Sequence, residues 1–167
     1  MRIIALVVLI CLAGCGYTFP GHSGTLPGGV ERLYVPLVVN KTSEPQLENK
    51  MSNRLSEVLP RNSKIILVDS PEEADGILKA TVLSYSKGAI SYDRNDDISE
   101  YRATIVMTAV LQQAGTEEVL WEKTLRWSTE YIADTNKNIQ SDLEKQAIDE
   151  VTLRLAEETL FQLTDDF

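Results

Sequence analysis

Two long stretches in the second half of the chain alternate between apolar and polar residues, and this alternation limits the fold more than any other feature of the sequence. In the first stretch, one face carries Tyr101, Ala103, Ile105, Met107, Ala109 and Leu111. In the second, one face carries Val119, Trp121, Leu125, Trp127 and Tyr131. Because a repeat of two places successive side chains on opposite sides of a strand, residues 101–111 and 118–131 predict two strands with one buried and one more polar face. Residues 113–117 predict the hairpin turn between them.

Three further segments predict shorter strands. Residues 32–39 are β-branched and aliphatic but contain Pro36, which cannot donate a hydrogen bond to a neighbouring strand, so we expect an edge strand or a bulged one. Residues 64–68 predict a short buried strand, and residues 76–86 predict a strand with apolar residues on both faces. The polar residues 87–100 predict the tip of a hairpin that leads into the strand at 101–111.

Two segments carry apolar residues at helical spacing. In residues 45–59, one face carries Leu47, Met51, Leu55, Val58 and Leu59, and Pro60 ends the pattern. In residues 141–163, Ser141 and Glu144 form a capping-box pattern at the start of a long helix. The chain therefore predicts an α+β fold, a two-layer sandwich in which two helices pack on one face of a mainly antiparallel sheet.

The last predicted helix has two apolar stripes. The first contains Leu143, Ala147, Ile148, Val151 and Leu155 and is expected to pack on the sheet. The second, on the opposite side, contains Leu153, Ala156, Leu160 and Leu163. This second stripe is either a scatter of exposed apolar residues, which is normal on a protein surface, or a surface that faces a partner.

The amino terminus has the organisation of a secretory signal. Arg2 precedes an apolar run over residues 3–13, which is too short to span a membrane as a helix. The run ends in Leu12-Ala13-Gly14-Cys15, which resembles the lipobox of bacterial lipoproteins. That resemblance implies that residues 1–14 are a signal peptide and that Cys15 carries a diacylglycerol and, on its new amine, a further acyl chain such as palmitate. The alternative is a plain secreted protein with a chance cysteine.

Residues 15–30 predict a tether between the lipid and a domain at 31–167, because residues 16–30 contain five glycines and two prolines. Residues 17–19 can instead form a strand-like arm on the domain. Gly16 follows the cysteine. An Asp at this position resembles the signal that retains lipoproteins at the inner membrane of enteric bacteria, and this chain does not have it. We therefore expect the protein on the periplasmic side of the outer membrane.

Charge and composition exclude several functions. The formal net charge is -9, which argues against nucleic-acid binding because an acidic surface releases no counterions from a phosphate backbone. The cysteines are Cys11 and Cys15 and the single histidine is His22, so a disulfide in the mature chain, a cysteine metal site and a Ser-His-Asp triad are not expected. Phosphate-binding glycine loops and zinc-protease or hydrolase motifs do not occur. We expect no enzyme and no cofactor apart from the covalent lipid on Cys15.

Several landmarks occur in a fixed order along the chain. They are Gly14-Cys15-Gly16-Tyr17, Val35-Pro36, Ala74-Asp75-Gly76-Ile77-Leu78, Glu100-Tyr101-Arg102, and a long helix after Asn138-Ile139-Gln140-Ser141-Asp142. Together they resemble the LptE family, the lipopolysaccharide-assembly lipoproteins of Gram-negative outer membranes. The resemblance implies two helices against a four-stranded sheet. It also implies a partner, the large β-barrel LptD, which the lipoprotein plugs and helps to assemble, and binding of lipopolysaccharide.

The resemblance also implies two lipopolysaccharide-binding residues, an arginine in the central hairpin tip and a lysine just before the last helix. These match Arg94 and Lys137, and Lys87 and Arg102 are neighbouring candidates. Arg and Lys bind phosphate through charge-assisted hydrogen bonds. The alternative for each residue is a solvated surface charge, and the aspartates beside Arg94 repel phosphate unless a cation bridges them.

Two other classes of protein remain open at this stage. The first is another outer-membrane lipoprotein that faces the periplasm, of the CsgG-like or peptidoglycan-synthase-activating type, since residues 31–85 do not separate these from LptE. The second is a small-ligand carrier lipoprotein, which needs an apolar cavity that a two-layer domain of this size has little volume to form.

Overall fold

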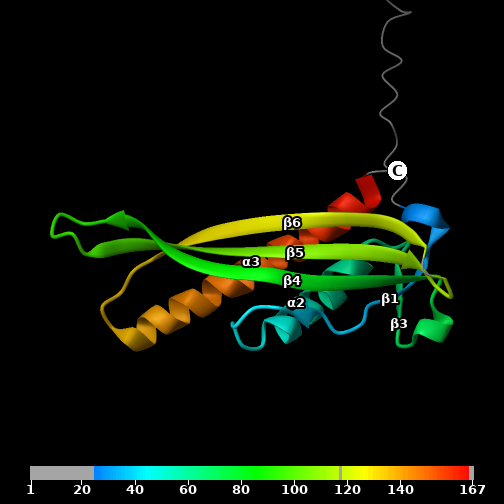
Figure 1. Ribbon diagram of the computed structural model, residues 1–167, viewed down its shortest axis with the longest axis horizontal. Coiled ribbons are helices and arrows are strands. Elements are labelled where there is room, and N and C mark those ends of the chain that lie inside the picture. The colour runs from blue at the N-terminus through cyan, green and yellow to red at the C-terminus, as the bar shows by residue number, and fades with distance from the viewer. Residues whose placement is uncertain (1–24, 117, 166–167) are drawn as a thin grey trace, which may run out of the picture.

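The computed structural model describes residues 25–116 and 118–165, and the predicted signal peptide and Cys15 lie outside these ranges. Figure 1 shows an elongated two-layer domain in which the two α-helices lie on the same face of one long sheet. The helices are α2 (Leu47–Val58) and α3 (Lys137–Asp165), and the short 3-10 turns are η1 (Pro27–Gly29), η2 (Leu59–Arg61) and η3 (Pro71–Glu73). The strands are β1 (Arg32–Tyr34), β2 (Val39–Asn40), β3 (Ile66–Val68), β4 (Gly76–Tyr92), β5 (Ile98–Gln113) and β6 (Val119–Ile132). The α+β class and the two helices are confirmed.

The sheet has six strands of mixed direction, so the expectation of four mainly antiparallel strands is wrong in detail. Its order is β3-β1-β4-β5-β6, and β2 also pairs with β4. The long strands β4, β5 and β6 are antiparallel, whereas β1 pairs in parallel with β3 and β4, and β2 pairs in parallel with β4. The parallel pairs join segments that are far apart in the chain, which a local pattern does not reveal.

The predicted strand at 32–39 is split at Pro36 into β1 and β2. Proline lacks the N–H that a ladder needs, and both halves nevertheless pair with β4. β1 therefore lies inside the sheet rather than at its edge, and the edge position belongs to β3, where Ile66 is 55% exposed. The prediction of residues 64–68 as a buried strand is wrong for this reason, although Ile65 just before it is buried.

A bulge at Leu83 explains why β4 has apolar residues on both parities. Before the bulge Val82 pairs with Met107, and after it Ser84 pairs with Val106, so one residue is inserted. The insertion reverses which residues of β4 face the helices. Both strands of this hairpin are longer than predicted, and the connection shortens from residues 87–100 to residues 93–97.

The core lies between the helices and the inner face of the sheet. It contains fully buried side chains from both layers, among them Leu33, Met51, Leu55, Leu78, Ile105, Met107, Leu111 and Leu155. The stripe of α3 that was expected to pack on the sheet is buried at Ala147, Ile148, Val151 and Leu155.

The second stripe of α3 is largely covered by the domain itself, because α3 packs against α2 as well as against the sheet. Ala156 and Leu163 are fully buried, and Leu153 and Leu160 are half-buried against the core. This part of α3 therefore needs no external partner to explain its apolar character.

α3 begins four residues before the predicted capping box. The backbone N–H of Asn138 donates to Oδ1 of Asn136 at 3.0 Å, and the N–H of Gln140 donates to the carbonyl of Asn136 at 2.9 Å. Asn136 is therefore the N-cap, a position at which asparagine is favoured. Ser141 lies inside the helix, and Glu144 has a different role, described below.

The end of the predicted tether is folded onto the domain. Leu26 and Val30 are each 2% exposed and belong to the core. η1 holds Gly28 at φ 68°, a left-handed conformation that favours glycine, and a Cβ atom there would lie 2.9 Å from Leu120 Cδ1. Among residues 25–116 and 118–165, no helix is both long and apolar enough to cross a membrane.

Candidate functional site

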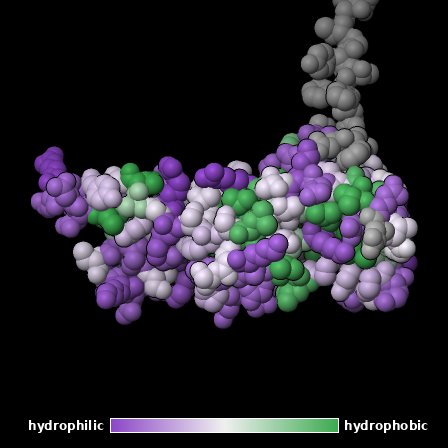
Figure 2. All heavy atoms as spheres, in the orientation of Figure 1, coloured by the Kyte–Doolittle hydropathy of each residue, from purple (hydrophilic) through white to green (hydrophobic). Residues whose placement is uncertain are grey.

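The free end of the β4–β5 hairpin and the start of α3 form one end of the elongated domain, here called the distal end (Figure 1). Large apolar side chains are exposed at the distal ends of three strands, with Tyr92 of β4 61%, Ile98 of β5 37% and Ile132 of β6 61% exposed. Figure 2 shows a green apolar patch directly behind the purple, hydrophilic tip. The distal end therefore combines apolar and charged surface, which suits an amphipathic ligand.

The hairpin tip is a tight turn organised by Asp93. Its Oδ1 accepts hydrogen bonds from the backbone N–H of Asn95 at 2.7 Å and of Asp97 at 3.1 Å. Asp96 has a φ of 65°. Such an Asx-type turn fixes the backbone and leaves the side chain of Arg94 exposed at the tip.

A hollow of about 530 Å³ lies between the tip and the start of α3. Its apolar and aromatic lining comes from Tyr92, Ile98, Tyr101 and Ala133. Its polar lining comes from Asp96, Asp97, Asp134, Thr135 and Gln140. The polar side chains approach from both the hairpin and the helix start, so the hollow depends on how these two elements are held together.

Gln140 lines the hollow from the first turn of α3. Its Oε1 accepts the backbone N–H of Asp134 at 2.7 Å, and Oδ1 of Asp134 accepts the N–H of Asn136 at 2.7 Å. The Nε2 group of Gln140 is buried and has no hydrogen-bond partner among the described residues. A buried amide donor without an acceptor is costly.

Arg94 and Lys137 are close in sequence to residues that line the hollow. Arg94 precedes two of its lining residues, Asp96 and Asp97, and Lys137 lies between Thr135 and Gln140. Both side chains are exposed. The structure thus brings these two candidate residues to the same end of the molecule, although neither lines the hollow itself.

Lys87 is on the inner face of the sheet and serves the packing of α3. Its Nζ donates to Oε2 of Glu144 at 2.6 Å and lies 5.9 Å from the ring centre of Tyr101, while the Tyr85 hydroxyl donates to Oε1 of Glu144 at 2.7 Å. Burial alone raises the pKa of Glu144, but the hydrogen bonds from Lys87 and Tyr85 outweigh it and lower the pKa below its usual value. Lys87 is therefore not a free cation for phosphate.

Arg102 is on the opposite, outer face of the sheet. It pairs across the strands with Gly88 and Glu130, and its guanidinium donates to Oε1 of Glu130 at 2.6 and 3.2 Å. Both charges are exposed, so this pair adds little stability. Of the four candidates, Arg94 and Lys137 share one location, whereas Lys87 and Arg102 lie on opposite faces and are each paired with a glutamate.

The outer face of β4, β5 and β6 is rich in hydroxyl groups. Thr81, Thr108 and Thr124 lie in one cross-strand row, and Ser86, Thr104 and Ser128 lie in another. Hydroxyl pairs bond across the strands, at 2.9 Å between Thr108 and Thr124 and at 2.8 Å between Thr104 and Ser128. The hydroxyl groups alternate on this face with partly exposed apolar side chains, such as Val106 and Val110.

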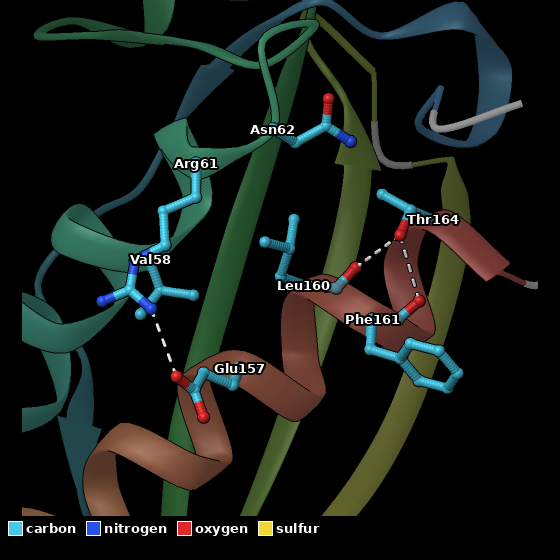
Figure 3. Close-up of a pocket in the computed structure, with 7 residues that line it drawn as sticks. All are labelled: Val58, Arg61, Asn62, Glu157, Leu160, Phe161 and Thr164. Atoms are coloured by element: carbon cyan, nitrogen blue, oxygen red, sulfur yellow. Dashed lines mark hydrogen bonds and ion pairs between the residues drawn. The ribbon is translucent and has the colours of Figure 1, made fainter. Parts of the chain in front are cut away.

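A second hollow, of about 400 Å³, lies at the other end of the domain between η2 and the last turns of α3 (Figure 3). Val58, Leu160 and Phe161 give it an apolar lining. Arg61 reaches across its edge to Glu157 at 3.2 Å and is also paired with Glu57 at 2.9 Å. These ion pairs tie α2 and η2 to α3, so the charged groups here already have partners within the domain.

Sequence reasoning did not assign Tyr92, Tyr101, Gln140 or Glu144 to a site. Tyr92 carries no motif, and Tyr101 and Gln140 occur only in segments that resemble the family. Glu144 matches a capping box that the structure does not contain. Within residues 25–116 and 118–165, no group of three or more metal-ligating side chains is placed to hold a metal ion. The fold and the distal hollow define an elongated two-layer α+β domain with a hollow lined by aromatic and acidic side chains at one end.

Comparison with protein families makes the assignment specific. The LptE family model, described as lipopolysaccharide-assembly, matches residues 30–163. The chain therefore belongs to the LptE family. Comparison with curated proteins gives no match.

Three solved structures share the fold. A lipoprotein B from Nitrosomonas europaea superposes with a TM-score of 0.61 at 15% identity, over 90% of this chain and 91% of that one. The rare lipoprotein B from Shewanella oneidensis gives 0.57 at 14% identity, over 78% and 91%. A lipoprotein from Caulobacter crescentus gives 0.55 at 10% identity, over 76% and 87%. At these identities the likeness establishes the fold alone.

Proposed function

We propose that this chain is an outer-membrane lipoprotein, anchored through lipid on Cys15 with its domain in the periplasm, that plugs the LptD β-barrel and assists its assembly. In this role it takes part in the insertion of lipopolysaccharide and performs no catalysis. The observation that carries the proposal is the match of the LptE family model across residues 30–163. Structural neighbours that are called lipoproteins support the membrane location.

The surface of the domain supports the role of a plug. The lumen of a large transmembrane barrel is polar, so a domain inside it needs polar sides without large apolar patches. The hydroxyl rows on the outer sheet face, including Thr108 and Thr124, give that face hydrogen-bonding groups that suit a polar lumen. A rigid sheet of three long antiparallel strands also keeps its shape when a partner surrounds it.

Co-purification tests the barrel partnership. A carboxyl-terminal affinity tag on the full-length protein is used to isolate it from outer membranes solubilised in mild detergent. We expect a large β-barrel protein to be recovered in stoichiometric amount. A matched Cys15→Ala variant is expected to be lost from the membrane fraction, which separates anchoring from barrel contact. Recovery of the lipoprotein without any barrel protein would reject the proposal.

Mass spectrometry of the native protein tests the anchor separately. We expect a mature chain that begins at Cys15 and carries acyl chains, because several acyl chains give an anchor that does not dissociate on biological timescales. An unmodified chain beginning at Met1 would contradict the lipoprotein assignment even if a barrel partner were found.

A further inference from the structure

We propose that the distal hollow binds an unphosphorylated sugar ring, neutral or amine-bearing, so that recognition of a glycolipid at this end of the domain is divided between a sugar subsite and separate cations. This inference deepens the proposed function and rests on it. It concerns the hollow lined by Tyr92, Tyr101, Asp96, Asp97 and Gln140 rather than Arg94 and Lys137.

Two tyrosine rings line the hollow. Tyr92 lines the hollow and is 61% exposed. Tyr101 also lines it, is half-buried, and stacks on Tyr131 with ring centres 5.6 Å apart. The stack holds Tyr101 in one orientation, so its ring forms a fixed wall. A sugar ring has an apolar face of C–H groups and a rim of hydroxyls, and it can therefore lie against a tyrosine ring while its rim remains hydrogen-bonded.

Polar groups without hydrogen-bond or ion-pair partners also belong to the residues that line the hollow. Within the described residues, the carboxylates of Asp96 and Asp97 and the hydroxyl of Thr135 have no hydrogen-bond or ion-pair partner. The Nε2 donor of Gln140 is buried and also unpaired. Carboxylate acceptors from the hairpin and a hydroxyl from the segment before α3 thus line one space. This arrangement suits a polyhydroxylated ring, since each sugar hydroxyl both donates and accepts.

Charge decides which sugars fit. Asp96, Asp97 and Asp134 line the hollow, and no lysine or arginine does. Phosphate or carboxylate groups inside it would face like charges at short range, which is unfavourable. A neutral ring avoids this cost and a protonated amine gains from it. Arg94 and Lys137 remain outside the hollow, where a phosphate on a neighbouring part of the same glycolipid could be bound.

The volume is adequate for this ligand. Ligand sites commonly enclose on the order of 300–1,000 Å³, and the hollow has about 530 Å³. It is open to solvent on one side, so a ring that belongs to a larger molecule can enter while the rest of the molecule extends outside.

Saturation-transfer NMR tests the inference with the full-length lipidated protein in detergent micelles. The probes are N-acetylglucosamine, glucosamine and glucosamine 6-phosphate. We expect transfer from the protein to the ring protons of the first two, and about fivefold weaker transfer to the phosphate because of the three carboxylates. Removing the ring of Tyr92 (Tyr92→Ala) should weaken sugar binding by about fivefold. Phe161→Ala, which removes a similarly exposed ring at the other end of the domain, should leave it unchanged.

The double variant Asp96→Asn and Asp97→Asn separates charge from shape, and asparagine tolerates the positive φ of residue 96. It should lose the preference for glucosamine over glucosamine 6-phosphate while still binding N-acetylglucosamine. The inference is overturned by absent saturation transfer, by equal transfer in wild type and Tyr92→Ala, or by stronger binding of the phosphate to wild type. Barrel co-purification is measured on the same variants, so loss of sugar binding with the barrel retained rejects this inference alone.

Discussion

Lys87 of β4 and Glu144 of α3 form an ion pair of 2.6 Å between residues that are 57 positions apart in the chain. Tyr85 of the same strand donates to the other oxygen of this carboxylate at 2.7 Å. The pair fixes the first turns of α3 against the inner face of the hairpin, in the half that is nearer to the tip. It thereby determines the relative position of the hairpin tip and the helix start, which together form the distal hollow.

Replacing Glu144 by glutamine tests this link through pH. The folded-state pKa of Glu144 is lowered, so its contribution to stability is present above the usual value of 4.5 and is lost as the pH falls through the folded-state value. Near neutral pH, Glu144→Gln should lower the free energy of unfolding by about 1 kcal/mol. Burial and the negative charge of Glu144 raise the pKa of Glu44 above its usual value. Because the substitution removes the repulsion between these two carboxylates, the net loss of stability is modest.

Chemical denaturation at neutral pH and near pH 3 measures this effect. We expect the difference between wild type and Glu144→Gln to shrink towards zero at the acidic end. A difference that is equally large at both pH values would show that the charge of Glu144 is not responsible.

The start of α3 gives a matched pair of substitutions. Asn136→Ala removes the side chain that accepts the N–H of Asn138 and should lower the free energy of unfolding by about 1 kcal/mol. Ser141→Ala changes an exposed residue inside the helix and should change it by less than about 0.5 kcal/mol. Thermal or denaturant unfolding monitored by circular dichroism compares the two. A larger loss for Ser141→Ala would restore the capping box expected from the sequence.

Two glycines of β4 differ in the space around them. A Cβ atom at Gly76 would lie 2.8 Å from Cγ1 of Val30 and 3.2 Å from Cδ1 of Leu111, whereas at Gly88 it would meet nothing within 4 Å. Gly76→Ala should therefore destabilise the domain by about 1–3 kcal/mol, and Gly88→Ala should be close to neutral. Equilibrium denaturation of both variants provides the measurement, and equal stability would mean that residues 25–30 do not pack on β4 as described.

Charge reversal at the distal end tests the two candidate cations there. Changing Arg94 and Lys137 together to aspartate should weaken lipopolysaccharide binding in vitro by tenfold or more, because charge-assisted contacts to phosphate are lost. Barrel association should remain. The control double variant Lys145→Asp and Arg154→Asp makes the same charge change on the exposed side of α3 and should have little effect. Equal binding by both double variants and wild type would remove Arg94 and Lys137 from the site.

Local patterns predicted most of the regular structure. The alternation in residues 101–111 identified the buried face of β5, and the spacing of Leu47, Met51 and Leu55 identified the buried face of α2. These predictions hold because each element buries one face, and burial is recorded in the order of side chains along the element itself. The apolar residues of 76–86 fitted no single period, since the bulge at Leu83 changes parity within the strand.

The ends of helices and the hydrogen-bond partners of individual side chains were less predictable from the sequence. Asn136 and Ser141 are both good N-cap residues, and the choice between them depends on where the chain leaves β6 and turns onto the sheet. Glu144 fits a capping box by sequence, yet its carboxylate binds Lys87 and Tyr85 on another element. A pairing across 57 residues leaves no trace in the local pattern.

The sequence by itself determined the buried faces of β5 and α2, the stripe of α3 that packs on the sheet, the α+β class, and the resemblance to the LptE family. In β6 it identified Trp121, Leu125 and Tyr131, whereas Val119 and Trp127 of the same predicted face are exposed. Only the tertiary structure decided that β1, β2 and β3 pair in parallel with distant strands, that Arg94 and Lys137 share one end of the domain while Lys87 and Arg102 do not, and that Tyr92, Tyr101 and Gln140 line one hollow. The reason is physical: periodicity reports how each segment meets the core, whereas a site is formed by side chains that are brought together only when separate segments pack.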